Sequence, residues 1–269
     1  MKRIFSLIIL ALLPVLASAQ PKVVGHRGCR FDGPFENTMA SMKVALDAGV
    51  DAIEFDINLT ADDRVIVFHG PKIPGTDGLD VRNITFKEAR KIVLPGGHQM
   101  PTLEEWFEEA RKHPETQFVL EIKHQLTPER ETLLVEKAME IVRKCKMEGQ
   151  IEYTAFGSHM CDAVKAVDKN AKVIYLSSGV HAHDAAWAKE KGYEGISYNL
   201  DCFLNNPWLV DQARELGIET TLWLVNDYEV ADWAIRHGID YISSDHPEKL
   251  TPYINAVKTY RRGPAIDRQ

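Results

Sequence analysis

Short apolar or β-branched segments alternate with amphipathic segments along most of this chain, which predicts a parallel α/β sheet with helices between its strands. Nine segments have the composition of strands, and one of them follows its predecessor too closely to be a parallel neighbour. The other eight match the strand count of a TIM (β/α)8 barrel, and the chain length suits that fold. We therefore predict a TIM barrel with a small antiparallel hairpin inserted after the second strand.

The predicted strands are rich in valine, isoleucine and aromatic residues, which favour extended backbone. They cover residues 23–26, 53–56, 65–68, 118–122, 151–154, 173–176, 195–198, 220–225 and 241–244. Only eight residues separate Asp56 from Val65, whereas a parallel crossover needs about a dozen or more. Residues 65–68 must therefore run back against the second strand, and this brings His69 over its end.

Capping signals mark several helices between these strands. Thr102 with Glu105 forms a capping box, and Asn226 with Glu229 forms a second. Three glycines stand where helices should end: Gly192, Gly217 and Gly238. No Ser-, Gly- or Pro-rich segment divides the chain, so we expect one domain over residues 20–269.

The first 19 residues have the order of a secretory signal peptide. Lys2 and Arg3 precede an apolar core at residues 4–16, and Ala-Ser-Ala at 17–19 is a small-x-small cleavage site. The apolar run is shorter than the ~20 residues of a membrane span. We expect cleavage after residue 19, no stable membrane insertion afterwards, and secretion across the inner membrane to a periplasmic or extracellular location.

The charge and the cysteines set further bounds. The formal net charge is -7, so nucleic acid is not an expected partner. The four cysteines lack the C-x-x-C spacing of metal sites: Cys29, Cys145, Cys161 and Cys202. In an exported protein they permit disulfides, and free thiols remain equally open. The sequence does not indicate the oligomeric state.

Glu54 and Asp56 are the most informative residues, because two acids stand within a predicted buried strand. Residues two apart in a strand share a face, so both carboxylates should point to one spot. A buried charge without compensation costs roughly several kcal/mol. A divalent cation between the carboxylates is the simplest compensation.

The carboxyl ends of the strands carry the chemistry of a TIM barrel. Polar residues gather there: His26, Arg27, Glu54, Asp56, Glu121, Lys123, Trp223 and Asn226, with His69 brought back by the hairpin. Three carboxylates without cysteine suit Mg²⁺ or Ca²⁺ and are poor for zinc. Arg27 and Lys123 fit an anionic substrate such as a phosphate. Most other histidines should be solvated or structural, although His124, beside Lys123, is a candidate for substrate contact.

The motifs at these strand ends, taken in order, resemble the glycerophosphodiester phosphodiesterase family. They are His26-Arg27-Gly28, Glu36-Asn37-Thr38, Glu54-x-Asp56, Val67-Phe68-His69, Glu121-x-Lys123, Trp223-Leu224-Val225-Asn226 and Ser244-Asp245-His246-Pro247. The resemblance runs over about residues 23–247. It implies a TIM-barrel enzyme with one divalent cation, Mg²⁺ or Ca²⁺. The implied reaction is hydrolysis of a small-molecule glycerophosphodiester to glycerol 3-phosphate and an alcohol.

The resemblance also implies a role for each matching residue. It makes Glu54, Asp56 and Glu121 the metal ligands and His26 and His69 the acid/base pair. It places Arg27, Lys123, Glu36, Asn37 and Trp223 in the substrate site. Of these, Arg27 and Lys123 would hold phosphoryl oxygens, Glu36 and Asn37 would support the site, and Trp223 would form an apolar wall.

One position departs from the family pattern. Members commonly have Asp directly after the second histidine, and this chain has Gly70. The His-Gly step is similar to the phosphoinositide-specific phospholipases, which keeps a phospholipase, or another phosphodiesterase or lyase, as an alternative. The chain has no basic run of the kind that binds lipid surfaces. A non-catalytic phosphodiester-binding protein is a remote alternative, because neither histidine and none of the three carboxylates is missing.

Overall fold

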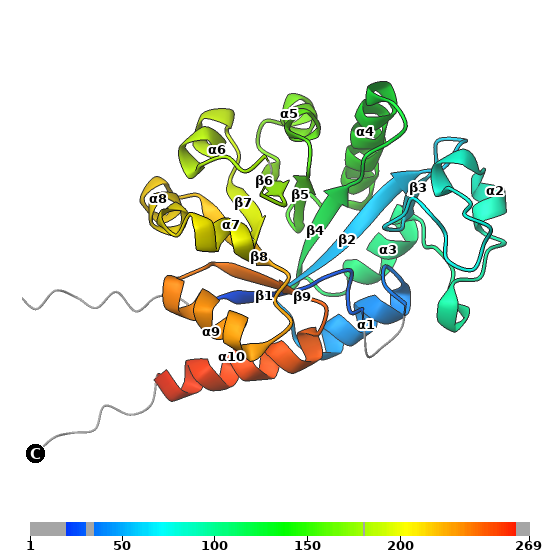
Figure 1. Cartoon of the computed structure of the whole chain (residues 1–269). Helices are drawn as coiled ribbons and strands as arrows, with labels where there is room; N and C mark the ends of the chain where they lie inside the picture. The colour runs from blue at the N-terminus through cyan, green and yellow to red at the C-terminus, as the bar shows by residue number, and fades with distance from the viewer. Residues whose placement is uncertain (1–19, 31–34, 180, 262–269) are drawn as a thin grey trace, which may run out of the picture.

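The computed structural model describes residues 20–30, 35–179 and 181–261, in which eight parallel strands close into a barrel (Figure 1). These strands are β1 (Lys22–Gly25), β2 (Ala52–Leu59), β4 (Gln117–Ile122), β5 (Ile151–Ala155), β6 (Lys172–Ser177), β7 (Gly195–Asn199), β8 (Glu219–Trp223) and β9 (Tyr241–Ser244). They pair in chain order, and the ring closes because β1 pairs with both β2 and β9. The predicted TIM barrel is confirmed.

The predicted hairpin is also confirmed. Strand β3 (Val65–Val67) lies outside the ring and pairs antiparallel with β2, with Val67 opposite Ile57. After β3 the backbone remains tied to β2, because the Phe68 amide donates to the Asp56 carbonyl at 2.9 Å. His69 is thereby delivered to the end of β2 at which Asp56 lies.

Helices surround the barrel (Figure 1). They are α1 (Met39–Asp47), α2 (Phe86–Ala89), α3 (Leu103–Ala110), α4 (Pro128–Cys145), α5 (Ser158–Val167), α6 (Ala185–Lys191), α7 (Leu200–Asn205), α8 (Trp208–Leu216), α9 (Tyr228–His237) and α10 (Pro247–Arg261), with 3₁₀ turns at Val81–Asn83 and Pro95–Gly97. Among described residues, no helix combines the length and apolar character of a membrane span. The predicted signal peptide at 1–19 lies outside the described residues.

The alternation of side chains along β2 explains why its acids point into the barrel. Phe55 packs against Trp106 of α3 with ring centroids 4.9 Å apart, and both side chains are fully buried. Burying a ring of this kind contributes about 1.5–3 kcal/mol. Since neighbouring residues of a strand face opposite sides, Glu54 and Asp56 point inward. A slip of one residue would drive both acids against α3.

Most of the predicted helix ends agree with the structure. The Thr102 amide donates to Glu105 Oε2 at 2.9 Å, and the Glu105 amide donates to Thr102 Oγ1 at 3.0 Å, which confirms the first capping box. Three helices end at glycines in the left-handed conformation, as predicted: Gly192, Gly217 and Gly238. The four cysteines, which all lie in the described part of the chain, form no disulfide there.

The second predicted capping box is wrong. Helix α9 is capped by Asp227, whose carboxylate accepts from the Val230 amide at 2.8 Å. The preceding Asn226 turns away from the helix, and its side-chain amide donates to Asp245 Oδ2 at 2.9 Å. Both residues have the side chains of good N-caps, and the tertiary contact with Asp245 decides between them.

Candidate active site

Three buried carboxylates meet at the carboxyl end of β2 and β4. The parallel register places Asp56 of β2 directly beside Glu121 of β4. Glu54, Asp56 and Glu121 are at most 7 % exposed, and their ligand oxygens lie within 4.8 Å of one another. Neighbouring strands of the barrel therefore build a compact group of acidic side chains from two separate sequence motifs.

The burial of these carboxylates changes their titration. Desolvation raises the pKa of Glu54 well above its usual range, and it raises the pKa of Glu121 to about 7, although the Lys123 ammonium opposes the second shift. Desolvation also acts on Asp56, but the Lys123 and Arg27 charges outweigh it and hold the pKa of Asp56 low. The three groups resist full ionisation together, and added positive charge between them would stabilise the ionised state.

Two cations face the acidic group. Lys123 Nζ lies 2.6 Å from Glu121 Oε1 and 3.3 Å from Asp56 Oδ1. Arg27 Nε lies 3.4 Å from Asp56 Oδ2, and the Arg27 amide donates to Glu54 Oε2 at 2.8 Å. Three carboxylates and two cations leave one net negative charge. A divalent cation would make it one net positive charge, which matches the single charge of a phosphodiester.

The donor set fits a hard divalent cation. All three candidate ligands are carboxylates, which Mg²⁺ and Ca²⁺ prefer. Glu54 Oε1 is buried and has no hydrogen-bond partner in the described part of the chain. Such an orphaned oxygen is costly unless a cation binds it.

Asn37 bonds to Asp56, and Glu36 bonds to Arg27. The buried Asn37 amide donates to Asp56 Oδ2 at 2.7 Å, and Asn37 Oδ1 accepts from the Asp56 backbone amide at 3.0 Å. Glu36 accepts two bonds from Arg27 Nη1, at 2.9 and 3.0 Å, and pairs with Arg30 at 2.8 Å. Asn37 is only 1 % exposed, and its two bonds to Asp56 suit it to orient that carboxylate.

Gly28 explains the close approach of the His26-Arg27-Gly28 turn to α1. Its φ is +80°, and a β-carbon there would lie only 2.6 Å from the backbone carbonyl carbon of Ser41. Only glycine meets both requirements without strain. The turn therefore packs directly on α1 and presents His26 and Arg27 at the mouth of the barrel.

His26 is oriented by a buried aspartate. Its Nδ1 lies 2.6 Å from Oδ1 of Asp245, the residue that follows β9, while Oδ2 of Asp245 accepts from Asn226. Burial alone would raise the pKa of Asp245, but the bond and charge of His26 and the Asn226 bond hold it lower than usual. An ionised Asp245 accepts the hydrogen bond of His26 Nδ1–H, so Nε2 is the nitrogen available for chemistry.

The sequence motifs included Asp245 without assigning it a role. Its position directly after a barrel strand was the signal that could have identified it. Asn226 was identified at the mouth, but it was interpreted as a helix cap. Together they form a chain of contacts from the β8–α9 loop through Asp245 to His26.

His69 is held through its backbone. Asn58, on the inward face of β2, donates to the Phe68 carbonyl at 2.7 Å and to the His69 carbonyl at 3.4 Å. The Gln125 side-chain amide in turn donates to Asn58 Oδ1 at 3.1 Å. Burial lowers the pKa of His69 to about 4; Lys123 and Arg27 add to this shift, and Asp56 opposes it. His69 is therefore neutral around pH 7. Sequence patterns did not identify Asn58 or Gln125.

The two histidines line one cavity with the acidic group. Arg27, Lys123, Glu54 and Glu121 also line it, and its apolar wall is formed by Phe156, Trp223 and Leu224. Trp223 Nε1 donates to the Ser197 carbonyl at 3.1 Å, and its ring meets Phe156 edge-on with centroids 6.0 Å apart. The tryptophan is therefore fixed and presents apolar surface to the cavity. Gly70 lines an adjoining hollow that shares His69 and Lys123.

Comparison with known proteins identifies the family of this chain. The model of the glycerophosphoryl diester phosphodiesterase family matches residues 26–249. A glycerophosphodiester phosphodiesterase of Caldanaerobacter subterraneus is 27 % identical over 249 residues, which are 88 % of this chain and 97 % of the relative.

Solved structures show the same fold. The crystal structure of a glycerophosphodiester phosphodiesterase from Parabacteroides distasonis has a TM-score of 0.83 and 26 % identity, over 89 % of this chain and 99 % of that one. A phosphodiesterase from Oleispira antarctica, solved with the product sn-glycerol-3-phosphate, has a TM-score of 0.77 and 21 % identity, over 88 % of this chain and 97 % of that one.

Replacing Asp245 tests whether it sets the tautomer of His26. In Asp245→Asn the charged acceptor is lost, so the His26 proton should no longer be held on Nδ1. Turnover should fall by about 100-fold or more. Nitrogen NMR shifts of the His26 ring report the tautomer directly. Asp227→Asn is the matched control, because asparagine also caps helices, and it should leave both readouts unchanged. If the His26 ring kept its wild-type tautomer in Asp245→Asn, the proposed role of Asp245 would be contradicted.

Proposed function

Because this chain belongs to the glycerophosphoryl diester phosphodiesterase family, we propose that it hydrolyses glycerophosphodiesters to glycerol 3-phosphate and an alcohol. The observation that carries the proposal is a single cavity lined by two histidines, two cations and buried carboxylates of the acidic group. Acid/base groups and an anion-binding site are the parts that phosphodiester hydrolysis requires.

The proposed reaction has two steps. One histidine accepts the proton of the glycerol hydroxyl next to the phosphate as this oxygen bonds to phosphorus. The other histidine protonates the departing alcohol, which leaves a cyclic phosphate. Water then opens the ring while the two histidines exchange roles, so that each recovers its starting protonation state. Arg27 and Lys123 hold phosphoryl oxygens, and Trp223 packs against the carbon skeleton of the glycerol.

We assign one divalent cation, Mg²⁺ or Ca²⁺, to Glu54, Asp56 and Glu121. When bound, it would lower the pKa of the attacking hydroxyl and neutralise charge that develops on the phosphoryl oxygens. Asn37 keeps Asp56 oriented for this task by bonding to both its carboxylate and its amide. The signal sequence read at residues 1–19 supports a periplasmic or extracellular location for the enzyme.

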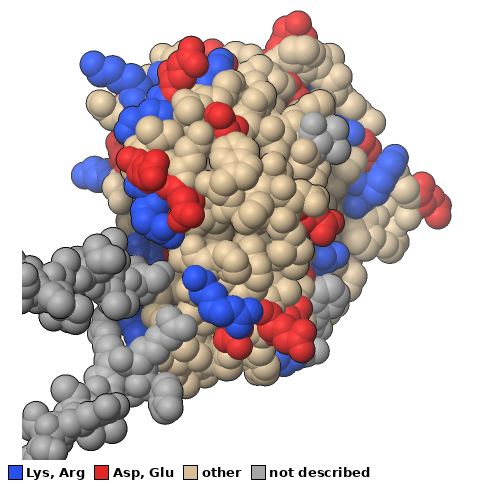
Figure 2. Space-filling model, turned by 60° about the vertical axis from the view of Figure 1, so that its left-hand side comes forward, with Lys and Arg blue, Asp and Glu red and all other residues tan. Residues whose placement is uncertain are grey.

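A phospholipase working at a lipid surface is the main alternative. Such an enzyme would use a basic patch or an exposed apolar rim to bind the membrane. On the face shown in Figure 2, basic and acidic side chains are mixed around a largely uncharged area, without a continuous basic patch. The sequence also has no basic run of the kind that binds lipid surfaces, and we propose small, water-soluble diesters as the substrates.

Chelation tests the metal assignment. The enzyme should turn over substrate only when a cation lies between its three buried carboxylates. A chelator should therefore abolish activity, and added Mg²⁺ or Ca²⁺ should restore it. The measurement is product analysis on a panel of glycerophosphodiesters that differ in their alcohol. Full activity in metal-free buffer would refute the metal site. Accumulation of cyclic phosphate without glycerol 3-phosphate would indicate a lyase instead.

Substitution of the two histidines tests the shared mechanism. His26→Ala and His69→Ala should each lower kcat by roughly 100-fold or more, because each step needs both an acid and a base. The double variant should be only slightly less active than either single variant, since the two side chains act as one unit. Steady-state kinetics measures this. Losses that multiply in the double variant would mean that the histidines act independently.

Gly70→Asp tests the departure from the family pattern. Gly70 has a φ of +55°, which Asp and Asn tolerate better than other side chains, and a β-carbon there would lie 3.3 Å from Asn58 Nδ2. The added carboxylate should narrow the range of accepted alcohols while leaving metal affinity largely unchanged. The measured quantity is the ratio of kcat/KM for a small and a bulky diester.

Gly70→Asn is the matched control, because it adds the same volume without the charge. If size decides, both variants should shift the ratio; if charge decides, only the Asp variant should. An unchanged ratio in both variants would refute a role of residue 70 in leaving-group selection. A collapse of metal affinity in Gly70→Asp would place residue 70 beside the cation.

A further inference from the structure

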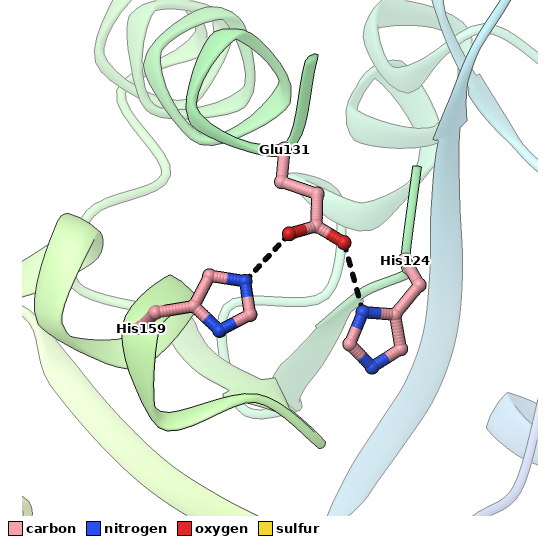
Figure 3. A group of neighbouring side chains, drawn as sticks. All are labelled: His124, Glu131 and His159. Carbon is pink, nitrogen blue, oxygen red and sulfur yellow. Dashed lines mark hydrogen bonds and ion pairs between the residues drawn. The ribbon is translucent and has the colours of Figure 1, made fainter. Parts of the chain in front are cut away.

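A second group of metal-ligating side chains lies beside the active site and has no part in the proposed reaction. It consists of His124, Glu131 and His159, which we call the rim cluster. His124 follows Lys123 just beyond β4, Glu131 lies in the first turn of α4, and His159 lies at the start of α5. Figure 3 shows both imidazoles directed at the two oxygens of one carboxylate.

The contacts within the rim cluster are short. His124 Nδ1 lies 2.8 Å from Glu131 Oε1, and His159 Nε2 lies 2.5 Å from Glu131 Oε2. The Glu131 side chain is only 9 % exposed, whereas each histidine side chain is 57 % exposed. A fixed, buried carboxylate is thus flanked by two imidazoles that ions in solution can reach.

The surroundings fix the Glu131 carboxylate and the backbone of His124, and they leave room for His159. The Gln125 backbone amide donates to Glu131 Oε1 at 3.2 Å, and the guanidinium of Arg82 donates to the His124 carbonyl at 3.1 Å. Gly157 leaves room for the second imidazole, because a β-carbon at that position would lie 2.6 Å from Cε1 of His159. The φ of Gly157 is -102°, which any residue can adopt, and a larger residue there would require the imidazole of His159 to shift.

We propose that the rim cluster is a binding site for a zinc-class transition-metal ion. Two imidazoles and one carboxylate are an established donor set for Zn²⁺, with the remaining position open to water. Zinc bonds of about 2.0–2.2 Å separate tetrahedral ligands by about 3.3 Å. The three ligand atoms already lie within 4.8 Å of one another, and the exposed imidazoles can rotate over the remaining distance.

The donor chemistry separates the two metal sites. The active-site group offers only carboxylate oxygens and suits Mg²⁺ or Ca²⁺, whereas imidazole nitrogen favours zinc and its neighbours in the periodic table. The rim cluster joins the end of β4 to α4 and α5, so its ion links three separate elements, and His124 lines the hollow that adjoins the active-site cavity. This inference does not depend on the proposed hydrolytic activity.

Zinc titration of the purified chain in excess Ca²⁺ tests the proposal. Wild-type protein should bind one equivalent of Zn²⁺. In His124→Ala and in His159→Ala the zinc affinity should be weaker by about 100-fold or more, because even changes beyond the ligands weaken metal affinity by about 10–100-fold. Calorimetry measures the affinity. His237→Ala, which removes an exposed histidine of α9, is the control and should bind zinc like the wild type.

Two further readouts use the wild-type protein and do not depend on how the variants fold. Zn²⁺ should shift the ring nitrogen resonances of His124 and His159, and it should raise the melting temperature because it binds only the folded chain. Zinc binding that survives in both histidine variants would overturn the proposal. Unshifted resonances of His124 and His159 at saturating Zn²⁺ would overturn it as well.

Discussion

The burial of three like charges at one end of the barrel is the constraint on which the active site depends. Glu54 and Asp56 point inward because the residues between and beside them pack on the helices, and Glu121 joins them through the parallel register of β2 and β4. Their mutual repulsion and desolvation are offset by Arg27 and Lys123 on this chain. The offset is incomplete by one charge, and this is the physical reason that the site suits a divalent cation.

The two histidines are positioned in different ways, and each way depends on the barrel. His26 is oriented through its side chain, by the ionised Asp245 at the end of β9. His69 is oriented through its backbone, by Asn58 on β2. Since β9, β1 and β2 are neighbours in the ring, closure of the barrel brings the two histidines to one cavity. A change in strand register would separate them.

The two proposed metal sites differ because they lie in different parts of the fold. The acidic group lies on the inner face of strands, where desolvation is strong and only paired carboxylates with nearby cations are tolerated. The rim cluster lies on loops and helix starts, where imidazoles remain partly exposed. We therefore assign Mg²⁺ or Ca²⁺ to the acidic group and a zinc-class ion to the rim cluster.

The sequence determined the barrel, the hairpin and the main polar residues at its mouth. These follow from local patterns: strand periodicity, connection lengths, and polar residues such as Glu54, His69 and Lys123 at strand ends. The partners that orient the site were decided by the tertiary structure. Asn226 has the signature of a helix cap but bonds to Asp245, and Asn58 supports His69 across the hairpin. Glu131 and His159 meet only because α4 and α5 start side by side. Such contacts join residues far apart in the chain, and a single sequence carries no local signal of which polar groups will become neighbours.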